Sequence, residues 1–325
     1  MSDESQQQQH ITVIDGGFST QLSFHVGENI DGDPLWSARF NAVNPEAVIQ
    51  SHLDFLNAGA EIILTNTYQA SIEGYQTYLD LDYHGSYELI KSTVKLAHIA
   101  RDKFLSSHIN HVKKPLIFAS IGPYGAHLHD GSEYTGSYEK RVSPAAIKKW
   151  HKVRIDACVE SGVDGLAIET IPCLMEANAL VDLVLTEYPN LKFWISFQCK
   201  NGEVIANGQR FSDCILSIWN QVEAAKRPEN LVAVGINCIN PSFVSPLFSE
   251  IEKNLCNFNV PLVVYPNSGE VYTVEEGWHG KNDCIPLENY IEEWVKLGAK
   301  YIGGCCRTNA HDIEKIKNKI EALKN

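Results

Sequence analysis

Three cysteines in two short motifs are the residues of this sequence best suited to carry out chemistry. Cys305 and Cys306 are adjacent in the motif GGCCRT (residues 303–308), and Cys238 ends the motif GINC (residues 235–238). Side chains alternate between the two faces of a regular strand, so two adjacent thiols reach one target only where the backbone bends. The two glycines before the pair lack a Cβ, and we expect them to provide that freedom.

These three thiols could hold a metal ion. Three thiolates around one ion form a zinc site with a fourth position open, as catalytic zinc requires. The spacing matches neither CxxC nor HExxH, so two other interpretations stay open: buried thiols that act as small hydrophobic side chains, and an adjacent pair that forms a redox-active disulfide. We interpret the remaining cysteines as bystanders: Cys158, Cys173, Cys199, Cys214, Cys256 and Cys284.

The type of ligand indicates the type of reaction. A zinc ion with three thiolate ligands has a net charge of about −1, which makes it a poor activator of water but a good holder of a further thiolate. A thiol at the open position would lose its proton near neutral pH and stay electron-rich. We therefore expect alkyl transfer to a sulfur atom. Hydrolysis has less support, because none of the twelve histidines follows a predicted strand and no Asp or Glu adjoins the cysteines.

Eight short apolar segments, each followed by a segment of helical periodicity, determine the expected fold. Such alternation is typical of a parallel sheet covered by helices, and eight units favour a closed (β/α)₈ TIM barrel over a doubly wound sheet. We expect a single α/β barrel domain over residues 11–325 after a disordered tail at residues 1–10. The predicted strands are 11–14, 61–64, 116–120, 165–168, 193–197, 231–236, 262–265 and 300–302, and the predicted helices are 45–58, 86–106, 143–161, 175–187, 212–226, 244–256, 287–297 and 310–323.

Long connections identify the functional end of this barrel. The segments 15–44, 65–85, 121–142 and 266–286 each lead from a predicted strand to a predicted helix. All four leave the C-terminal end of the barrel, where active sites of this fold lie. The cysteine motifs end strands six and eight, which are alternate strands, so their inward side chains can share a layer. We therefore predict that the three thiols meet at the barrel mouth.

Composition limits the partners and the compartment. A net charge of −13 argues against nucleic acid, which requires clustered Lys and Arg, and is compatible with a cationic small molecule. No apolar run is long enough to span a membrane, and no signal-peptide core follows Met1. The odd number of cysteines, nine, suits a reducing compartment. We expect a cytoplasmic protein that does not bind membranes and is a monomer, with weak homo-oligomerisation as the alternative.

Together the motifs resemble those of the zinc-dependent homocysteine S-methyltransferases. The resemblance covers nearly the whole chain, from DGG (15–17) through TNTY (65–68) and ETIP (169–172) to the two cysteine motifs. It implies a barrel that binds one Zn²⁺ and methylates homocysteine to methionine. In such enzymes a carboxylate contacts the amino group of homocysteine and a turn lies beside the substrates. Here the resemblance assigns the zinc ligands to Cys238, Cys305 and Cys306, the carboxylate to Glu169, and the turn to Asp15, Gly16 and Gly17.

Each further candidate for substrate binding also has a structural interpretation. The threonines could only satisfy loop amides, Asn267 and Asp15 could be turn residues, and the aromatic side chains could pack beneath a loop. The charge of Glu169 could be balanced by Arg307 instead of by a ligand ammonium. The candidates on the mouth loops are Trp36, Thr65, Thr67, Tyr68 and Asn267.

We expect the methyl donor to be a sulfonium, S-methylmethionine in preference to S-adenosylmethionine, because methyl loss leaves a neutral thioether and no glycine-rich nucleotide loop is present. The betaine-using branch of the family carries a C-terminal extension and has a Tyr at the position that matches Gln69, whereas this sequence stops at Asn325. The alternatives are a betaine- or selenocysteine-type methyltransferase, a zinc hydrolase or lyase, and a non-catalytic barrel with paired cysteines.

Overall fold

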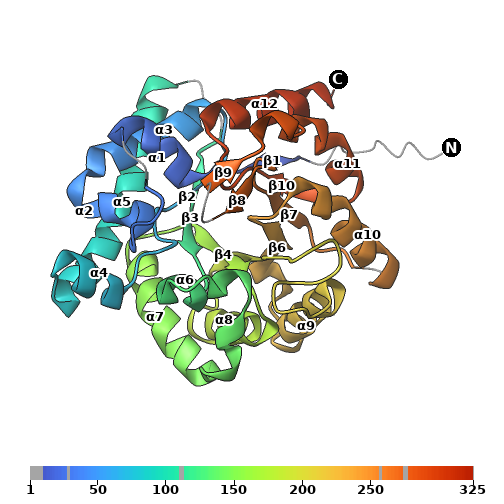
Figure 1. Ribbon diagram of the computed structural model, residues 1–325, viewed down its shortest axis with the longest axis horizontal. Coiled ribbons are helices and arrows are strands. Elements are labelled where there is room, and N and C mark those ends of the chain that lie inside the picture. The colour runs from blue at the N-terminus through green and yellow to red at the C-terminus, as the bar shows by residue number, and fades with distance from the viewer. Residues whose placement is uncertain (1–9, 28–29, 110–112, 256–257, 274–276, 325) are drawn as a thin grey trace.

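Eight parallel strands form a barrel in the computed structural model, which describes residues 10–27, 30–109, 113–255, 258–273 and 277–324 (Figure 1). In the hydrogen-bonded sheet, β10 lies between β7 and β1, and the other strands follow in chain order. Ile14 bridges Ile62 in parallel, so β1 and β2 close the ring. The predicted barrel is confirmed. Its strands are β1 (Thr12–Val13), β2 (Ile62–Leu64), β3 (Leu116–Ile121), β4 (Gly165–Ile171), β5 (Lys192–Phe197), β6 (Leu231–Asn237), β7 (Leu262–Tyr265) and β10 (Ala299–Ile302).

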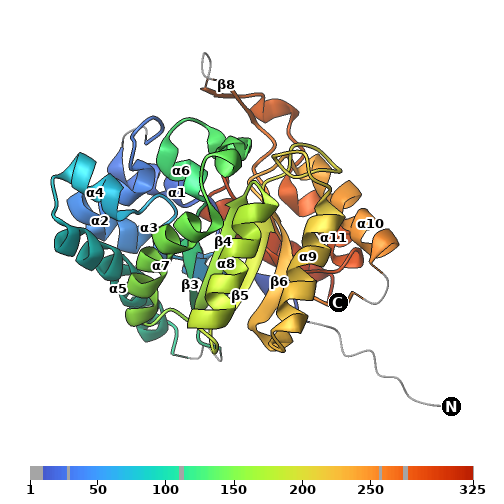
Figure 2. The same cartoon turned by 90° about the horizontal axis from the view of Figure 1, so that it is seen from below.

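A ring of helices covers the outside of the barrel (Figures 1 and 2). Several begin at side-chain caps of the preferred types: the Asn44 side chain accepts from Ala47 N, and Asn309 and Asp312 form a capping box. The helix predicted at 287–297 is split into a 3₁₀ turn (Leu287–Asn289) and a shorter helix. The ring consists of α3 (Pro45–Asn57), α5 (Tyr83–Ser107), α7 (Pro144–Glu160), α8 (Leu174–Glu187), α9 (Phe211–Ala224), α10 (Val244–Asn254), α11 (Ile291–Lys296) and α12 (Ala310–Ala322).

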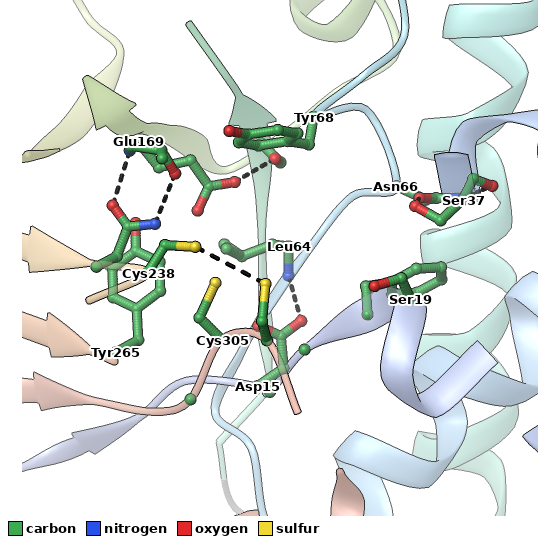
Figure 3. Close-up of a pocket in the computed structure, with 18 of the residues that line it drawn as sticks. Asp15, Ser19, Ser37, Leu64, Asn66, Tyr68, Glu169, Cys238, Tyr265 and Cys305 are labelled. Atoms are coloured by element: carbon green, nitrogen blue, oxygen red, sulfur yellow. Dashed lines mark hydrogen bonds between the residues drawn. The ribbon is translucent and has the colours of Figure 1, made fainter. Parts of the chain in front are cut away.

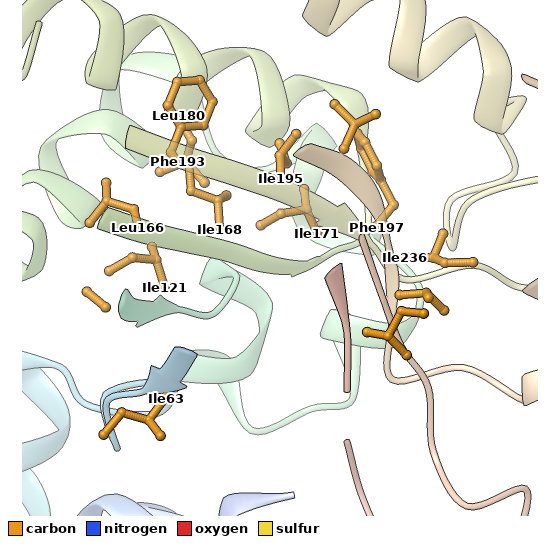
Figure 4. Packing of buried hydrophobic residues seen from close by; sticks show 14 of the residues in the cluster. Ile63, Ile121, Leu166, Ile168, Ile171, Leu180, Phe193, Ile195, Phe197 and Ile236 are labelled. Atoms are coloured by element: carbon orange, nitrogen blue, oxygen red, sulfur yellow. The ribbon is translucent and has the colours of Figure 1, made fainter. Parts of the chain in front are cut away.

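Alternation along the strands produces two apolar layers. Side chains such as Ile62, Phe118 and Trp194 fill the barrel interior, where the Phe118 and Trp194 rings stack with centroids 4.8 Å apart. The opposite strand faces pack against the helices, and Figure 4 shows part of this layer around β4 and β5. At Gly165 an added Cβ would lie 2.6 Å from the Phe118 ring, so a glycine is needed where that ring crosses β4. The closed ring therefore has a dense core on both sides of its strands.

The long connections contain elements that the sequence did not predict. The β8–β9 hairpin projects beyond the helical ring at the end of the barrel where α6 lies (Figure 2). No helix among the described residues is both long and apolar enough to cross a membrane. Of the predicted tail, residues 1–9 lie outside the described residues, and His10 Nε2 contacts Glu61 Oε2 at 2.7 Å. The additional elements are α1 (Phe18–Val26), α2 (Phe40–Val43), α4 (Ile72–Leu79), α6 (Tyr124–Leu128), β8 (Val271–Thr273), β9 (Gly277–His279) and 3₁₀ turns at Trp36–Arg39, Ser132–Tyr134, Ser137–Lys140 and Lys281–Asp283.

Candidate metal centre and substrate cavity

The three cysteines predicted to meet at the barrel mouth do lie together. The sulfur atoms of Cys238, Cys305 and Cys306 all lie within 4.8 Å of one another, and those of Cys238 and Cys306 are 3.7 Å apart. Figure 3 shows Cys238 and Cys305 directed into one space. Tetrahedral zinc with Zn–S bonds of about 2.3 Å places its sulfur ligands about 3.8 Å apart. The number, type and spacing of the donors therefore fit a zinc ion with its fourth position open.

The bend that brings the adjacent thiols together differs from the sequence expectation. Gly303 and Gly304 have φ angles outside the left-handed region, so they are not needed for an unusual backbone conformation. They are needed for space: an added Cβ would lie 2.6 Å from Asp15 O at Gly303 and 2.3 Å from Thr308 Oγ1 at Gly304. The left-handed residue is Arg307, with φ 65°, directly after the pair.

Backbone hydrogen bonds from two other loops fix the cysteine turn. Cys305 N donates to Pro266 O at 2.8 Å, and Ser268 N donates to Cys306 O at 3.1 Å, which ties the turn to the segment after β7. From the segment after β1, Gly17 N donates to Thr308 O at 3.0 Å. The segments after β1 and β7 therefore hold the turn that carries Cys305 and Cys306, although the segment after β1 is far from it in the sequence.

Non-glycine residues with left-handed backbone conformations cluster around the thiols. Cys238 itself has φ 54°, and Thr170 has φ 59°. Asn237 stabilises this conformation, since Thr170 N donates to Asn237 Oδ1 at 2.7 Å and Asn237 Nδ2 donates to Thr170 Oγ1 at 2.8 Å. Such conformations cost about 1–3 kcal/mol each and are tolerated where the surroundings determine them. No propensity or periodicity of the sequence indicates these backbone conformations.

The thiols open into a cavity with about 660 Å³ of space not filled by atoms, part of it open to solvent. Two predicted substrate-binding residues do not line it. Thr67 Oγ1 donates to Ser120 O at 2.7 Å, and Asn267 N donates to Ile239 O at 2.9 Å. The predicted residues that do line the cavity are Asp15, Gly16, Gly17, Trp36, Thr65, Tyr68, Glu169, Cys238, Cys305 and Cys306.

Sequence reasoning missed about half of the cavity wall. Ser120 and Tyr265 end or follow predicted strands at the same barrel end as the cysteines, so strand position alone could have identified them. Ser19, Ser37 and Tyr134 lie in helical segments that no pattern indicated. The unpredicted lining residues are Phe18, Ser19, Ser37, Leu64, Asn66, Ser120, Tyr134, Thr170, Asn237, Tyr265 and Gly304.

Two buried carboxylates face the cavity on different sides of the thiols (Figure 3). Glu169 is 6% exposed, and burial raises its pKa to about 7 against the opposing hydrogen bonds from Ser120 and Tyr265. Burial also raises the pKa of Asp15 well above its usual value, although Leu64 N donates to Asp15 Oδ2 at 2.7 Å. A bound cation would compensate both carboxylates.

Arg307 does not balance Glu169, as one sequence interpretation suggested. Its guanidinium binds Glu270 instead, with Nε 3.2 Å from Oε2 and Nη2 3.2 Å from Oε1. Aromatic rings complete the wall: Trp36 and Tyr68 meet edge to face with centroids 6.0 Å apart, and Tyr134 also lines the cavity. The cavity therefore combines thiols, carboxylates and aromatic faces, a set suited to a sulfur-containing cation or amino acid.

Comparisons with known proteins match the whole barrel. The sequence model of the family described as Homocysteine S-methyltransferase matches residues 12–320. The chain is 48% identical to Betaine-homocysteine S-methyltransferase of Drosophila melanogaster over 316 residues, covering 96% of this chain and 95% of the relative. It is 40% identical to Homocysteine S-methyltransferase 1 of Arabidopsis thaliana over 324 residues, covering 95% and 93%.

A solved structure shows the same similarity in three dimensions. The metallated form of the homocysteine methyltransferase MmuM from Escherichia coli superposes with a TM-score of 0.82 at 35% sequence identity. The alignment covers 96% of this chain and 97% of the E. coli chain. The likeness therefore extends over nearly the whole of both chains.

Proposed function

The chain belongs to the homocysteine S-methyltransferase family, and we propose that it transfers a methyl group from a sulfonium donor to the sulfur of homocysteine, giving methionine. The family establishes a methyltransferase that acts on homocysteine. The donor, the metal and the roles of individual residues are the proposal. The observation that carries it is the meeting of three thiols within 4.8 Å beneath a cavity with two buried carboxylates.

We assign a zinc ion to the three thiols. Bound there, zinc would act as a Lewis acid that lowers the pKa of the homocysteine thiol and keeps its sulfur nucleophilic. The donor set supports this assignment, as does the metallated form in which the E. coli structure is described. Cys238, Cys305 and Cys306 would hold the ion, and hydrogen bonds fix the backbone turn that carries Cys305 and Cys306.

We assign the carboxylates of Glu169 and Asp15 to the amino group of homocysteine. An ammonium has three N–H donors, and its positive charge would compensate the negative charges of the two buried carboxylates. Ser120 Oγ donates to Glu169, which fixes the position of the carboxylate. Because these groups are anchored on β1, β3 and β4, they would orient the substrate so that its thiol points to the cysteines.

A sulfonium donor needs no acid at its leaving group, because loss of the methyl group leaves a neutral thioether. The bond between the methyl carbon and the donor sulfur breaks as the bond to the homocysteine sulfur forms, and both products are neutral thioethers. The indole ring of Trp36 would stabilise the donor cation. Gln69 has a structural role, because its Nε2 donates to Ala126 O at 2.6 Å and links two mouth loops. We propose S-methylmethionine, with S-adenosylmethionine as the second sulfonium.

Betaine is the second candidate donor. The observation in its favour is the 48% identity to a Drosophila protein whose name specifies betaine. A quaternary ammonium would also be stabilised by an aromatic wall. The two donors differ in the leaving group, a neutral thioether from a sulfonium and a tertiary amine from betaine.

A donor panel tests the proposal. Zinc-loaded protein would be assayed with homocysteine and methyl-deuterated S-methylmethionine, S-adenosylmethionine or betaine at equal concentrations, with labelled methionine measured by mass spectrometry. We expect the fastest transfer from S-methylmethionine. Faster transfer from betaine than from either sulfonium would overturn the donor assignment, and no labelled methionine with any donor would overturn the activity.

A further inference from the structure

A second cavity lies beside the first and meets it at the metal centre. It has about 360 Å³ of space not filled by atoms. Ser19, Trp36 and Cys306 line both cavities, so the two cavities adjoin at Cys306. The assignments above place homocysteine in the first cavity and use no part of the second beyond these shared residues.

Segments far apart in the sequence build this second cavity. Asp31 and Trp36 come from the connection after α1, Trp278 comes from β9, and Arg307 follows the cysteine pair. Trp36 holds its indole there with a left-handed backbone, φ 47°. Loops from both ends of the chain therefore converge on one hollow next to Cys306.

The chemistry of the wall is that of a zwitterion site. Asp31 offers a carboxylate, Arg307 a guanidinium, and Trp36 and Trp278 two indole rings. Arg307 is held in place, because its side chain binds Glu270 and its backbone N donates to Thr20 Oγ1 at 3.0 Å. A guanidinium has five N–H donors, and the Glu270 bonds involve Nε and Nη2. A carboxylate, a guanidinium and indoles match an amino acid that also carries a side-chain cation.

We propose that the second cavity binds the methyl donor by its amino-acid end, with Asp31 accepting the donor's α-ammonium, Arg307 facing its carboxylate, and the sulfonium lying between the indoles beside Cys306. The inference rests on the proposed sulfonium-to-homocysteine transfer and deepens it by naming how the donor is recognised. Displacement at carbon requires the two sulfur atoms on opposite sides of the methyl group. In this proposal the donor and homocysteine occupy adjoining cavities that share Cys306 and Trp36, and the methyl group lies between their sulfur atoms.

The step balances without a further reactant. The C–S bond of the sulfonium breaks with its electron pair going to the donor sulfur, while the homocysteine thiolate forms the new C–S bond. The proton of the homocysteine thiol leaves to solvent when that thiol binds. From S-methylmethionine, both products are methionine.

Asp31 is therefore a specificity residue. S-methylmethionine has an α-ammonium, a carboxylate and a sulfonium. Dimethylsulfoniopropionate has the carboxylate and the sulfonium but no ammonium, and betaine likewise has no primary ammonium. Only the first of these donors can use Asp31, so the Asp31 carboxylate distinguishes amino-acid sulfoniums from simpler methyl cations.

The variant Asp31→Asn tests this assignment in zinc-loaded, full-length protein. We expect KM for S-methylmethionine to rise about tenfold, as for loss of one charge pair, with kcat and the KM for homocysteine within about twofold. The kcat/KM for dimethylsulfoniopropionate should stay unchanged. The matched control is Asp80→Asn, at an exposed left-handed position (φ 56°) that asparagine tolerates. Equal losses with both sulfoniums, or no change with S-methylmethionine, would overturn the assignment.

A binding measurement separates this inference from the proposed function. Calorimetric titration of S-methylmethionine into wild-type and Asp31→Asn protein needs no turnover. Weaker binding in the variant supports the second cavity even if the wild type forms no methionine, a result that would count against the proposed function alone. Equal binding to both proteins overturns the role of Asp31, whatever the activity.

Discussion

The interior of the barrel and its mouth are built from the same strands but follow different rules. The interior contains ordinary apolar side chains such as Ile62, Phe118 and Trp194, each buried against others of its kind. The mouth contains three thiols and two buried carboxylates. It also has non-glycine residues with positive φ. The comparison indicates that the packed ring provides stability and that its C-terminal end carries features that would be unfavourable elsewhere.

This division has a mechanical basis. The ring is closed by the bridge between Ile14 and Ile62, and it is packed on both faces of its strands. The mouth groups are then fixed by hydrogen bonds between loops, such as that from Cys305 N to Pro266 O. Changes at the mouth should therefore affect function and leave the fold intact. Changes in the interior should lower the stability of the fold and leave the function of the folded molecules nearly unchanged.

The largest expected effect is on activity, from Cys305→Ser. We expect loss of zinc and of detectable methionine formation, because two thiols and a hydroxyl bind zinc far more weakly than three thiolates. The circular dichroism spectrum should stay that of a folded barrel, since the ring does not depend on metal. Cys214→Ser is the control, because that thiol is fully buried away from the site and its loss should leave one zinc per chain. Full zinc occupancy in Cys305→Ser would remove it from the ligand set.

The opposite outcome is expected in the interior from Phe118→Ala. Removing a ring that stacks on Trp194 should lower the free energy of unfolding by about 3–5 kcal/mol. Zinc content and kcat of the folded molecules should change little. Urea unfolding followed by circular dichroism measures the first effect, and Phe24→Ala, at a side chain 66% exposed, should change it by less than about 0.5 kcal/mol. A large loss of zinc in Phe118→Ala would mean that the two regions are coupled.

Glu169→Gln should have a smaller effect at the mouth. We expect kcat/KM for homocysteine to fall by the equivalent of about 2–5 kcal/mol, because one partner of a buried charge pair is lost. Zinc content should not change. The exposed Glu203→Gln serves as the control. Wild-type kinetics in Glu169→Gln would reassign this carboxylate to a structural role.

The smallest effect concerns His52 in the helical wall, where it packs on Phe18 with ring centroids 4.6 Å apart. Neither ring nitrogen has a hydrogen-bond partner, and burial lowers the pKa of His52 to about 3. In the unfolded chain the imidazole of His52 gains a proton near pH 6.5, whereas in the folded chain it stays neutral. The free energy of unfolding therefore falls as the pH drops below 6.5. His52→Leu should remove about 1.4 kcal/mol per pH unit of that dependence between pH 6 and 4. Urea unfolding at several pH values measures this pH dependence, with His84→Leu at an exposed position as the control. If the free energy of unfolding of His52→Leu changes with pH as steeply as that of the wild type, the prediction is wrong.

The parts predicted from sequence are those that repeat or that follow a strand. All eight strands were found because a buried parallel strand is a short, continuous apolar run. The meeting of Cys238 with the cysteine pair followed from their places at the ends of alternate strands. Both inferences depend only on the position of a residue along a regular element.

The parts that escaped prediction are in the long loops. The helix α1 and the β8–β9 hairpin have no repeat to identify them, and their positions depend on contacts with distant segments. Gly304 was expected to supply an unusual φ, but it is needed because Thr308 Oγ1 approaches closely. Thr67, a predicted substrate-binding residue, does not line the cavity, and its hydroxyl donates to Ser120 O on β3. Close contacts between segments that are distant in the chain leave no local pattern in a single sequence.

The most direct test of the central claim, that three thiols present an open metal position to homocysteine, is X-ray absorption spectroscopy at the zinc edge. The measurement compares zinc-loaded protein before and after addition of homocysteine. We predict three sulfur ligands and one lighter ligand before addition, and four sulfur ligands at about 2.3 Å after it. A sulfur count that stays at three when saturating homocysteine is present would contradict the account.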